Sequence, residues 1–295
     1  MKQFLITLIL LCRVILCGET IPDGTGKNIT FNKPFKRIIS LYPAHTENII
    51  NLGGKSLIIG TSRSHSKITQ SLNVKRFSSS DGAERFLALR PDLIIVRPML
   101  LRAHKTLFSK LRRMGITVIS IQPTSIKEMY DYWLVLGKIT GHTDKAKEMI
   151  ETFKAGVSVF KKRVAHIPKE RRKRVYFEAI HKRMKTFSCN SMAIFVLETA
   201  GGINVASDAT VIRKSNIASY GKERILSKAN DIDFFLSQKG RMNPVTREEI
   251  INEPGFEVIK AIKERNVFLV PEGIVSRPTI SLLKGIEKIQ KKLYF

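Results

Sequence analysis

The loops that follow the predicted strands carry most of the side chains in this 295-residue chain that could do chemistry. In an open α/β sheet, ligands bind beyond the carboxyl ends of the strands. Guanidinium and imidazole groups suit anionic ligands, because they donate charge-assisted hydrogen bonds to oxygen atoms. We therefore predict a binding site for an anionic ligand. The candidate ligand-binding residues are Tyr42, His45, Arg63, His65, Arg97, His181, Arg183 and Arg277.

Two other kinds of site use the same residue types. His45, His65 and His181 could meet around zinc or manganese, but no HxH or HExxH spacing supports a bare metal site. For an enzyme we find no serine elbow, phosphate-binding glycine loop or metalloprotease motif. A thiol–imidazole pair of Cys189 with His181 has no surrounding pattern either. We expect no catalysis, no resident metal and no cofactor.

Short apolar strands alternate with helices along the chain, which is typical of mostly parallel, helix-covered sheets. The longest helix is predicted from Thr143 to about Pro168, with apolar residues at spacings of three and four. At about 1.5 Å per residue it is long enough to join two lobes. We predict an α/β protein with an N-terminal lobe (18–142), one long rigid linker helix (143–168) and a C-terminal lobe (169–295). Strands are expected over 37–41, 56–60, 93–96, 116–121, 174–180, 232–236 and 267–270, and further helices over 46–52, 101–114, 125–140 and 192–200.

One short pattern, Ser-x-Gly-x-Glu-Arg-x-Leu, occurs twice. Residues 80–92 align without a gap on residues 219–231, and each copy precedes an apolar strand. Each copy also carries one matched glutamate, Glu84 or Glu223. Capping is a local explanation for Glu84, because Asp81-x-x-Glu84 fits a capping box. The second copy has Tyr220 in place of Asp81, a poor cap, so the repeat favours a role that both glutamates share.

The first 17 residues match a secretory signal. Lys2 precedes an apolar run from Phe4 to Leu11 that is too short to span a membrane. Cys17 stands where a lipoprotein signal places its acylated cysteine, although Leu16 occupies a position where a small residue is expected. We expect a protein that is periplasmic, or held by a lipid anchor at Cys17 on the outer face of the cytoplasmic membrane.

The chain has 51 Lys and Arg against 25 Asp and Glu, a formal charge of +26. Such an excess suits nucleic acid, an anionic membrane surface or an anionic small ligand, and a solvated basic surface explains most of it. A nucleic-acid-binding protein is an alternative on charge alone, and it would show a steep salt dependence. The export signal argues against it, so we expect no nucleic-acid partner.

Several local signatures follow one another in a fixed order over residues 36–295. In order and spacing they resemble the exported substrate-binding proteins of ABC importers for iron complexes and vitamin B12. That resemblance implies two α/β lobes on one rigid helix and an ABC permease as partner. It also implies that one glutamate of each lobe, Glu84 and Glu223, docks into permease arginines. The signatures are Ile39-Ser-Leu-Tyr-Pro-Ala-His-Thr-Glu47, Leu52-Gly-Gly, Arg90-Pro-Asp-Leu-Ile-Ile-Val96, Glu198-Thr-Ala-Gly-Gly-Ile-Asn204, Ala261-Ile-Lys-Glu-Arg-Asn-Val267, Arg277-Pro278 and Gly285-Ile-Glu.

The resemblance also bears on the transported ligand. Haem-carrying relatives use a tyrosine shortly before the first glutamate motif, and residues 61–83 contain none. A ferric siderophore, with negative charge on its iron-binding oxygens, fits the basic loops best. A corrinoid, haem, an oxyanion such as molybdate and a bare divalent metal are the alternatives.

Overall fold

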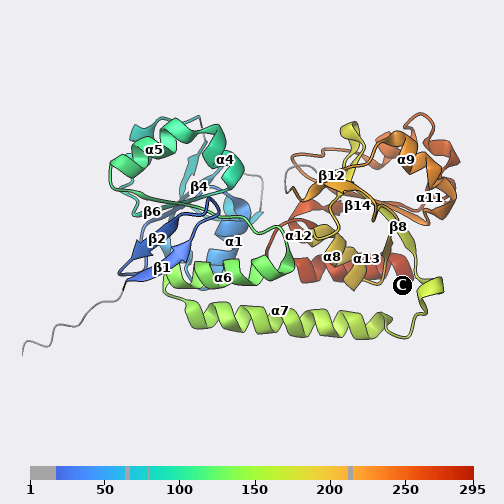
Figure 1. Cartoon of the computed structure of the whole chain (residues 1–295), viewed down its shortest axis with the longest axis horizontal. Coiled ribbons are helices and arrows are strands. Elements are labelled where there is room, and N and C mark those ends of the chain that lie inside the picture. Colours follow the sequence, from blue (N-terminus) through green and yellow to red (C-terminus); the bar gives the residue numbers. More distant parts are fainter. Residues whose placement is uncertain (1–17, 64–66, 79, 212–214) are drawn as a thin grey trace, which may run out of the picture.

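The computed structural model describes residues 18–63, 67–78, 80–211 and 215–295. The predicted signal segment with Cys17, and His65, lie outside these residues. The described chain forms two α/β lobes side by side, with one long helix beneath both (Figure 1). This arrangement confirms the predicted fold class.

The N-terminal lobe is built on a parallel sheet. Its strand order is β5 (Lys75–Phe77), β4 (Ile58–Ser62), β3 (Ile38–Ser40), β6 (Leu93–Val96) and β7 (Thr117–Ser120). Every residue of β6 is buried, as expected for an apolar strand that is covered on both faces. The lobe also contains the antiparallel pair β1 (Glu19–Pro22) and β2 (Asn28–Phe31), and the helices α1 (Pro43–Asn51), α2 (Lys67–Gln70), α3 (Ala83–Leu87), α4 (Pro98–Ala103), α5 (Lys105–Arg113) and α6 (Ile126–Thr140).

One helix prediction in this lobe was wrong. The segment 101–114 is not continuous, because α4 ends at Ala103 and α5 begins at Lys105. His104 lies between them with φ −124° and ψ 41°, outside the helical region. Helix α1 also begins three residues before the predicted start, at Pro43, whose fixed φ suits a first helical position.

The C-terminal lobe is built on a mixed sheet. Its parallel part consists of β10 (Ile203–Asn204), β8 (Arg174–Ile180), β13 (Phe234–Lys239) and β14 (Val267–Pro271). An antiparallel part, which the sequence pattern did not predict, extends it through β9 (Lys185–Phe187), β12 (Ile217–Ser219) and β11 (Thr210–Val211). The helices are α8 (Met192–Thr199), α9 (Lys222–Ser227), α10 (Arg247–Ile251), α11 (Lys260–Lys263), α12 (Glu272–Val275) and α13 (Leu282–Tyr294).

Helix α7 (Thr143–Val164) runs along the base of both lobes (Figure 1). Its buried face carries Ala146, Met149, Ile150 and Phe153 at helical spacing. Phe153 packs edge-on against Trp133 of α6, with ring centroids 5.6 Å apart. One hydrophobic cluster contains residues of both sheets together with α6, α7, α8 and α13. The lobes are therefore joined by a shared core as well as by the helix.

Hydrogen bonds between the lobes reinforce this junction. The carbonyl of Pro278, in the C-terminal lobe, accepts from Asn48 Nδ2 (2.9 Å) and from Trp133 Nε1 (3.1 Å) in the N-terminal lobe. Ser281 Oγ donates to the Glu47 carboxylate at 2.5 Å. Because these groups are buried or half-buried, breaking the contacts would leave polar atoms without partners. Within the part of the chain described, no helix is long and apolar enough to cross a membrane.

Candidate functional site

Tyr42 and Arg97 meet at the carboxyl edge of the N-terminal sheet. Tyr42 lies just beyond β3 and Arg97 follows β6, and these two strands are parallel neighbours. The Arg97 guanidinium lies over the Tyr42 ring, 4.5 Å from its centroid. Such stacking holds a guanidinium in place without using its N–H donors. The two side chains are thus in contact, and their role in binding a ligand stays a prediction.

Arg277 approaches the same tyrosine from the C-terminal lobe. Burial raises the pKa of the Tyr42 hydroxyl, against the opposing fields of the Arg97 and Arg277 guanidinium groups. Arg277 Nε lies 3.3 Å from Glu272 Oε1, so part of its charge is balanced within its own lobe. Sequence reasoning missed Glu272, since nothing in its neighbourhood marks it as a partner.

Arg97 differs from Arg277 in having no partner for its donors. Within residues 18–63, 67–78, 80–211 and 215–295 its side chain makes no hydrogen bond or ion pair, although the residue is half-buried. A guanidinium offers five N–H donors in a planar fork that matches carboxylate or phosphate oxygens. This cluster is therefore a candidate site for an oxyanion. An open hollow lined by Lys154, Val157, Ser158, Lys161, Lys162 and Ala165 lies on α7, away from the cluster.

His45 was predicted to face the ligand, but the structure places it in the core. It is fully buried, and its Nδ1 lies 2.7 Å from the Tyr132 hydroxyl. Burial lowers the pKa of His45 to about 3, so the imidazole is neutral at physiological pH. Its ring packs edge-on against Tyr42 at 5.1 Å. The His45 ring thus packs against Tyr42, and because it is neutral it offers no charge to a ligand.

His181 also lies among fixed polar partners. Its Nδ1 is 2.8 Å from Oε1 of the fully buried Glu178, and its Nε2 is 3.6 Å from Glu253 Oε2. Burial lowers the pKa of His181, but the hydrogen bond and charge of Glu178 outweigh it and raise that pKa. Glu178 accepts a further hydrogen bond from Ser237 Oγ at 2.6 Å. This network holds the end of β8 in place.

No hydrogen bond, ion pair or ring contact joins Arg63 or Arg183 to Tyr42, Arg97 or Arg277 within the described residues. Arg63 is exposed and its ionic partner is Asp81, at 3.7 Å. The Arg183 side chain is exposed and has no hydrogen bond or ion pair in the part of the chain described. His65 lies outside that part, so its position stays a prediction. Among the described residues, no group of three His, Cys, Asp or Glu is arranged to hold a metal ion.

Glu84 and Glu223 occupy equivalent positions in the two lobes. Each is the second residue of a short helix, α3 or α9, that follows a glycine, and each carboxylate is exposed. The capping box proposed for Glu84 is not formed: α3 begins after Gly82, and Asp81 instead accepts from Ser78 N at 2.8 Å. The sequence pattern did not indicate two charged residues that lie beside these helices. Lys110 on α5 pairs with Glu84 of α3, and Asp208, before β11, pairs with Arg224 of α9.

The two glutamates differ in their local charge. Lys110 Nζ donates to Glu84 at 2.7 Å, and this hydrogen bond lowers the pKa of the Glu84 carboxyl. The Glu223 carboxylate has no hydrogen bond or ion pair to any residue the structure describes. Among the described residues, no cation therefore pairs with this carboxylate in the C-terminal lobe.

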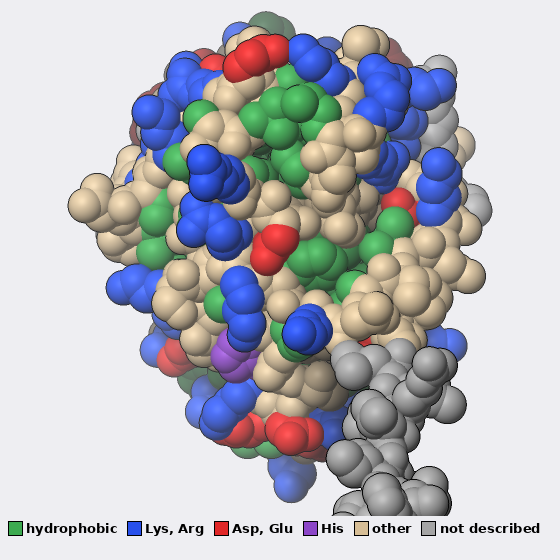
Figure 2. All heavy atoms as spheres, turned by 90° about the vertical axis from the view of Figure 1, so that its left-hand side faces the viewer, with side chains coloured by type: hydrophobic (Ala, Val, Ile, Leu, Met, Phe, Trp, Pro, Cys, Tyr) green, Lys and Arg blue, Asp and Glu red, His purple; other side chains and the backbone are tan. Residues whose placement is uncertain are grey.

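The positive charge on one face of the molecule is scattered. Figure 2 shows the face at the end of the N-terminal lobe, where Lys and Arg side chains are scattered among neutral, hydrophobic and a few acidic ones. On the described part of this face they form no continuous basic track of the kind that follows a nucleic-acid backbone. This distribution fits the interpretation of a solvated basic surface.

Comparisons with solved structures support the fold and extend it to a group of binding proteins. A periplasmic solute-binding protein of Staphylococcus epidermidis, described as a possible iron-binding protein, matches with a TM-score of 0.75 and 25% identity, over 89% of this chain and 100% of that one. A protein of an Fe3+-hydroxamate transport system from Saccharomonospora viridis matches with a TM-score of 0.69 and 20% identity, over 94% and 99% of the two chains. The second likeness bears on the fold alone.

Sequence comparisons identify the family. An uncharacterized ABC transporter substrate-binding lipoprotein of Bacillus subtilis is 23% identical over 93% of this chain and 85% of its own length. A cobalamin-binding protein of Halobacterium salinarum is 25% identical over 72% of this chain and 57% of its own length. The family model for periplasmic binding proteins matches residues 38–273, which is most of the chain. The chain therefore belongs to the periplasmic binding protein family, whose members serve ABC transporters.

Proposed function

We propose that this protein is an exported solute-binding protein that captures an anionic iron complex in a cleft between its lobes and delivers it to an ABC permease. The observation that carries the proposal is Arg97, whose donors are unused and whose guanidinium is held on Tyr42 beside Arg277 of the other lobe. A ferric siderophore presents negatively charged oxygens that suit these donors. The structural relative from Staphylococcus epidermidis, described as a possible iron-binding protein, supports the same ligand class.

A corrinoid is the second candidate, because relatives in Halobacterium and Yersinia are described as cobalamin- or vitamin B12-binding proteins. Thermal unfolding with ferric hydroxamate and catecholate siderophores, cobalamin, haem, molybdate and zinc separates the candidates. We expect the ferric siderophores to raise the melting temperature. Stabilisation by cobalamin or zinc alone would overturn the choice of ligand.

The role of Arg97 can be tested with the same probes. Arg97→Gln should weaken binding of the stabilising ferric siderophore by roughly tenfold or more, because a charge-assisted pair to the ligand is lost. Arg113→Gln, an exposed arginine at the end of α5, is the matched control and should leave binding unchanged. Equal affinity in both variants would remove Arg97 from the site. We retain Arg183, at the end of β8, as a further proposed contact.

Docking on the permease is assigned to Glu84 and Glu223. Reversing both charges, Glu84→Lys with Glu223→Lys, should abolish uptake of the ligand in cells while ligand affinity stays unchanged. Glu148→Lys with Glu151→Lys, two exposed reversals on α7, controls for the same change in net charge. If the double variant still supports uptake, or if it loses ligand affinity, the docking assignment is wrong.

For localisation we propose acylation at Cys17 after export. The lipoprotein relative from Bacillus subtilis supports this proposal. Metabolic labelling with a palmitate analogue should modify the wild-type chain and spare Cys17→Ser. An unlabelled wild-type chain that is released in soluble form would show that the signal is cleaved without lipidation.

A further inference from the structure

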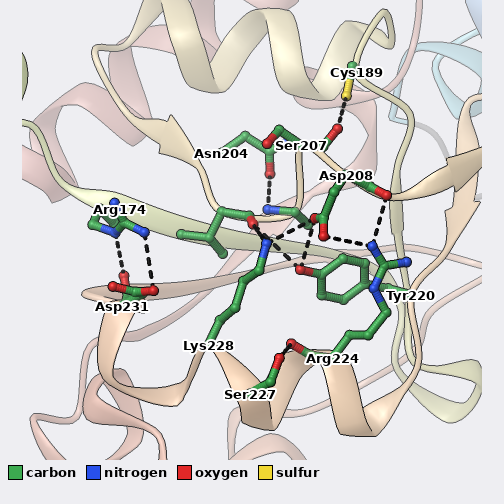
Figure 3. A network of polar contacts seen from close by, with 12 residues as sticks. Arg174, Cys189, Asn204, Ser207, Asp208, Tyr220, Arg224, Ser227, Lys228 and Asp231 are labelled. Carbon is green, nitrogen blue, oxygen red and sulfur yellow. Dashed lines mark hydrogen bonds and ion pairs between the residues drawn. The ribbon is translucent and has the colours of Figure 1, made fainter.

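In both copies of the repeat, the residue after the proposed docking glutamate is an arginine that binds to its own lobe. Arg224 Nη2 donates to the Asp208 carbonyl at 2.8 Å and to Asp208 Oδ2 at 2.7 Å (Figure 3). In the N-terminal lobe, Arg85 Nε lies 3.4 Å from Asp81 Oδ2. Neighbouring side chains of each helix thus point in different directions: the glutamate to solvent and the arginine to an aspartate.

Asp208 gathers three donors of the C-terminal lobe around one carboxylate. Besides Arg224 it accepts from Lys228 Nζ at 3.0 Å and from the Tyr220 hydroxyl at 3.2 Å (Figure 3). Burial opposes ionisation, but the hydrogen bonds from Lys228 and Arg224 hold the pKa of the Asp208 carboxyl well below its usual range. The Arg224 guanidinium also stacks over the Tyr220 ring at 4.5 Å. Lys228 is the C-cap residue directly after α9, about one turn beyond Arg224, so Asp208 binds both the middle and the end of this helix.

Helix α9 needs such an anchor for two reasons. It is only six residues long, and a helix of that length is unstable by itself in water. It also begins after Gly221, at φ 92°, without any side-chain cap. Because Glu223 contacts no charged group among the described residues, only the helix itself sets the direction of its carboxylate.

We propose that Arg224 and Asp208 are positioning residues for docking: they orient α9 so that Glu223 presents its carboxylate to the permease. This inference rests on the docking role of Glu223 proposed above. Arg85 and Asp81 perform the same task for Glu84, with the arginine lying over Phe77 at 5.9 Å where Arg224 uses Tyr220. This proposal explains why the Glu-Arg pair occurs in both lobes: the glutamate contacts the permease, and the arginine fixes the orientation of the helix that carries the glutamate.

The test is a double-mutant cycle on the full chain, read as affinity for its own ABC permease in lipid nanodiscs. Arg224→Ala should weaken permease binding by roughly threefold to tenfold in the wild-type background and have no further effect in a Glu223→Gln background. Arg224→Lys should restore part of the affinity, since a lysine keeps the charge but lacks the planar guanidinium that stacks on Tyr220. Asp208→Asn, which keeps the shape of the side chain, serves as a second variant if Arg224→Ala unfolds.

Arg174→Ala is the matched control, because it breaks the Arg174–Asp231 ion pair (3.3 Å) in the same lobe without touching α9 (Figure 3). It should leave permease binding unchanged. Equal weakening by Arg224→Ala in both backgrounds, or weakening by Arg174→Ala to the same degree, would overturn the positioning role. If Glu223→Gln alone leaves permease binding intact, the docking assignment itself fails and the inference falls with it; a loss with Glu223→Gln but none with Arg224→Ala rejects only the inference.

Discussion

The neutral, buried imidazole of His45 leads to a testable prediction of how the free energy of unfolding depends on pH. Asn48 Nδ2 donates to the Tyr132 hydroxyl at 3.2 Å, and that hydroxyl lies 2.7 Å from His45 Nδ1. The neutral imidazole takes part in this buried network through Nδ1. A second proton on the ring would place a charge inside the core, where no acidic group pairs with it among the described residues.

The size of the effect follows from the pKa. Burial lowers the pKa of His45 to about 3 in the native state, whereas a histidine in the unfolded chain titrates near 6.5. Below pH 6.5 the unfolded state binds a proton that the native state does not bind. The free energy of unfolding therefore falls by about 1.4 kcal/mol for each pH unit of acidification. At pH 4.5, two pH units below the unfolded-state pKa, His45 alone should lower the free energy of unfolding by about 2–3 kcal/mol.

Urea unfolding of the wild type and of His45→Asn at pH 7.5, 6.5, 5.5 and 4.5 measures this contribution. Asparagine keeps an acceptor oxygen for Tyr132 and does not titrate. At pH 7.5 the variant should be less stable by about 1–3 kcal/mol, because part of the imidazole volume is left empty. The gap should close as the pH falls to 4.5.

The titration of His181 does not affect the difference in stability between the wild type and His45→Asn. The pKa of His181 is raised in the native state, so its stabilising contribution is complete below pH 6.5 and is lost as the pH rises through the native pKa. That dependence has the opposite sign, and it cancels between two proteins that both contain His181. Parallel stability curves for the wild type and His45→Asn would refute the reasoning, since they would show that native His45 takes up its proton normally.

Two further perturbations test other parts of the structure. Lys110→Met frees Glu84 from its partner and should strengthen permease binding, by no more than roughly fivefold since exposed ion pairs are weak; weaker binding in the nanodisc assay would show that Lys110 itself contacts the permease. Gly285→Ala places a methyl group against the Ile274 carbonyl and should lower the free energy of unfolding by about 1–3 kcal/mol. Lys284→Ala, exposed on the same helix, should change that free energy by less than about 0.5 kcal/mol in the same denaturation experiment, and equal effects would contradict the packing argument.

The parts of the fold that could be predicted are those with a strong local pattern. The run Leu93–Val96 is wholly apolar and becomes a fully buried strand. The antiparallel strands β9, β11 and β12 have two or three residues each, too few for any periodicity to show. They form because neighbouring strands offer hydrogen bonds, which is information from distant parts of the chain.

In the candidate site, too, some residues could be predicted from a local pattern and others depend on distant parts of the chain. Strand ends located Tyr42 and Arg97 because β3 and β6 are parallel neighbours. His45 follows one turn later, and its burial could not be foreseen: α1 is covered on all sides, from Ala44 to Ile49, by packing between the lobes. The partner of Arg224 was equally hidden, since Asp208 lies 16 residues upstream without any shared motif.

The shared core and the hydrogen bonds to Pro278 and Ser281 have a consequence for how loading is sensed. They fix the spacing between the two lobes, and with it the distance between Glu84 and Glu223. If Glu84 and Glu223 dock as proposed, these lobe contacts hold their carboxylates at one separation whether or not the proposed ligand is bound. A permease that distinguishes loaded from empty protein would then have to contact the surface around Arg97 and Arg277, where that ligand is proposed to bind.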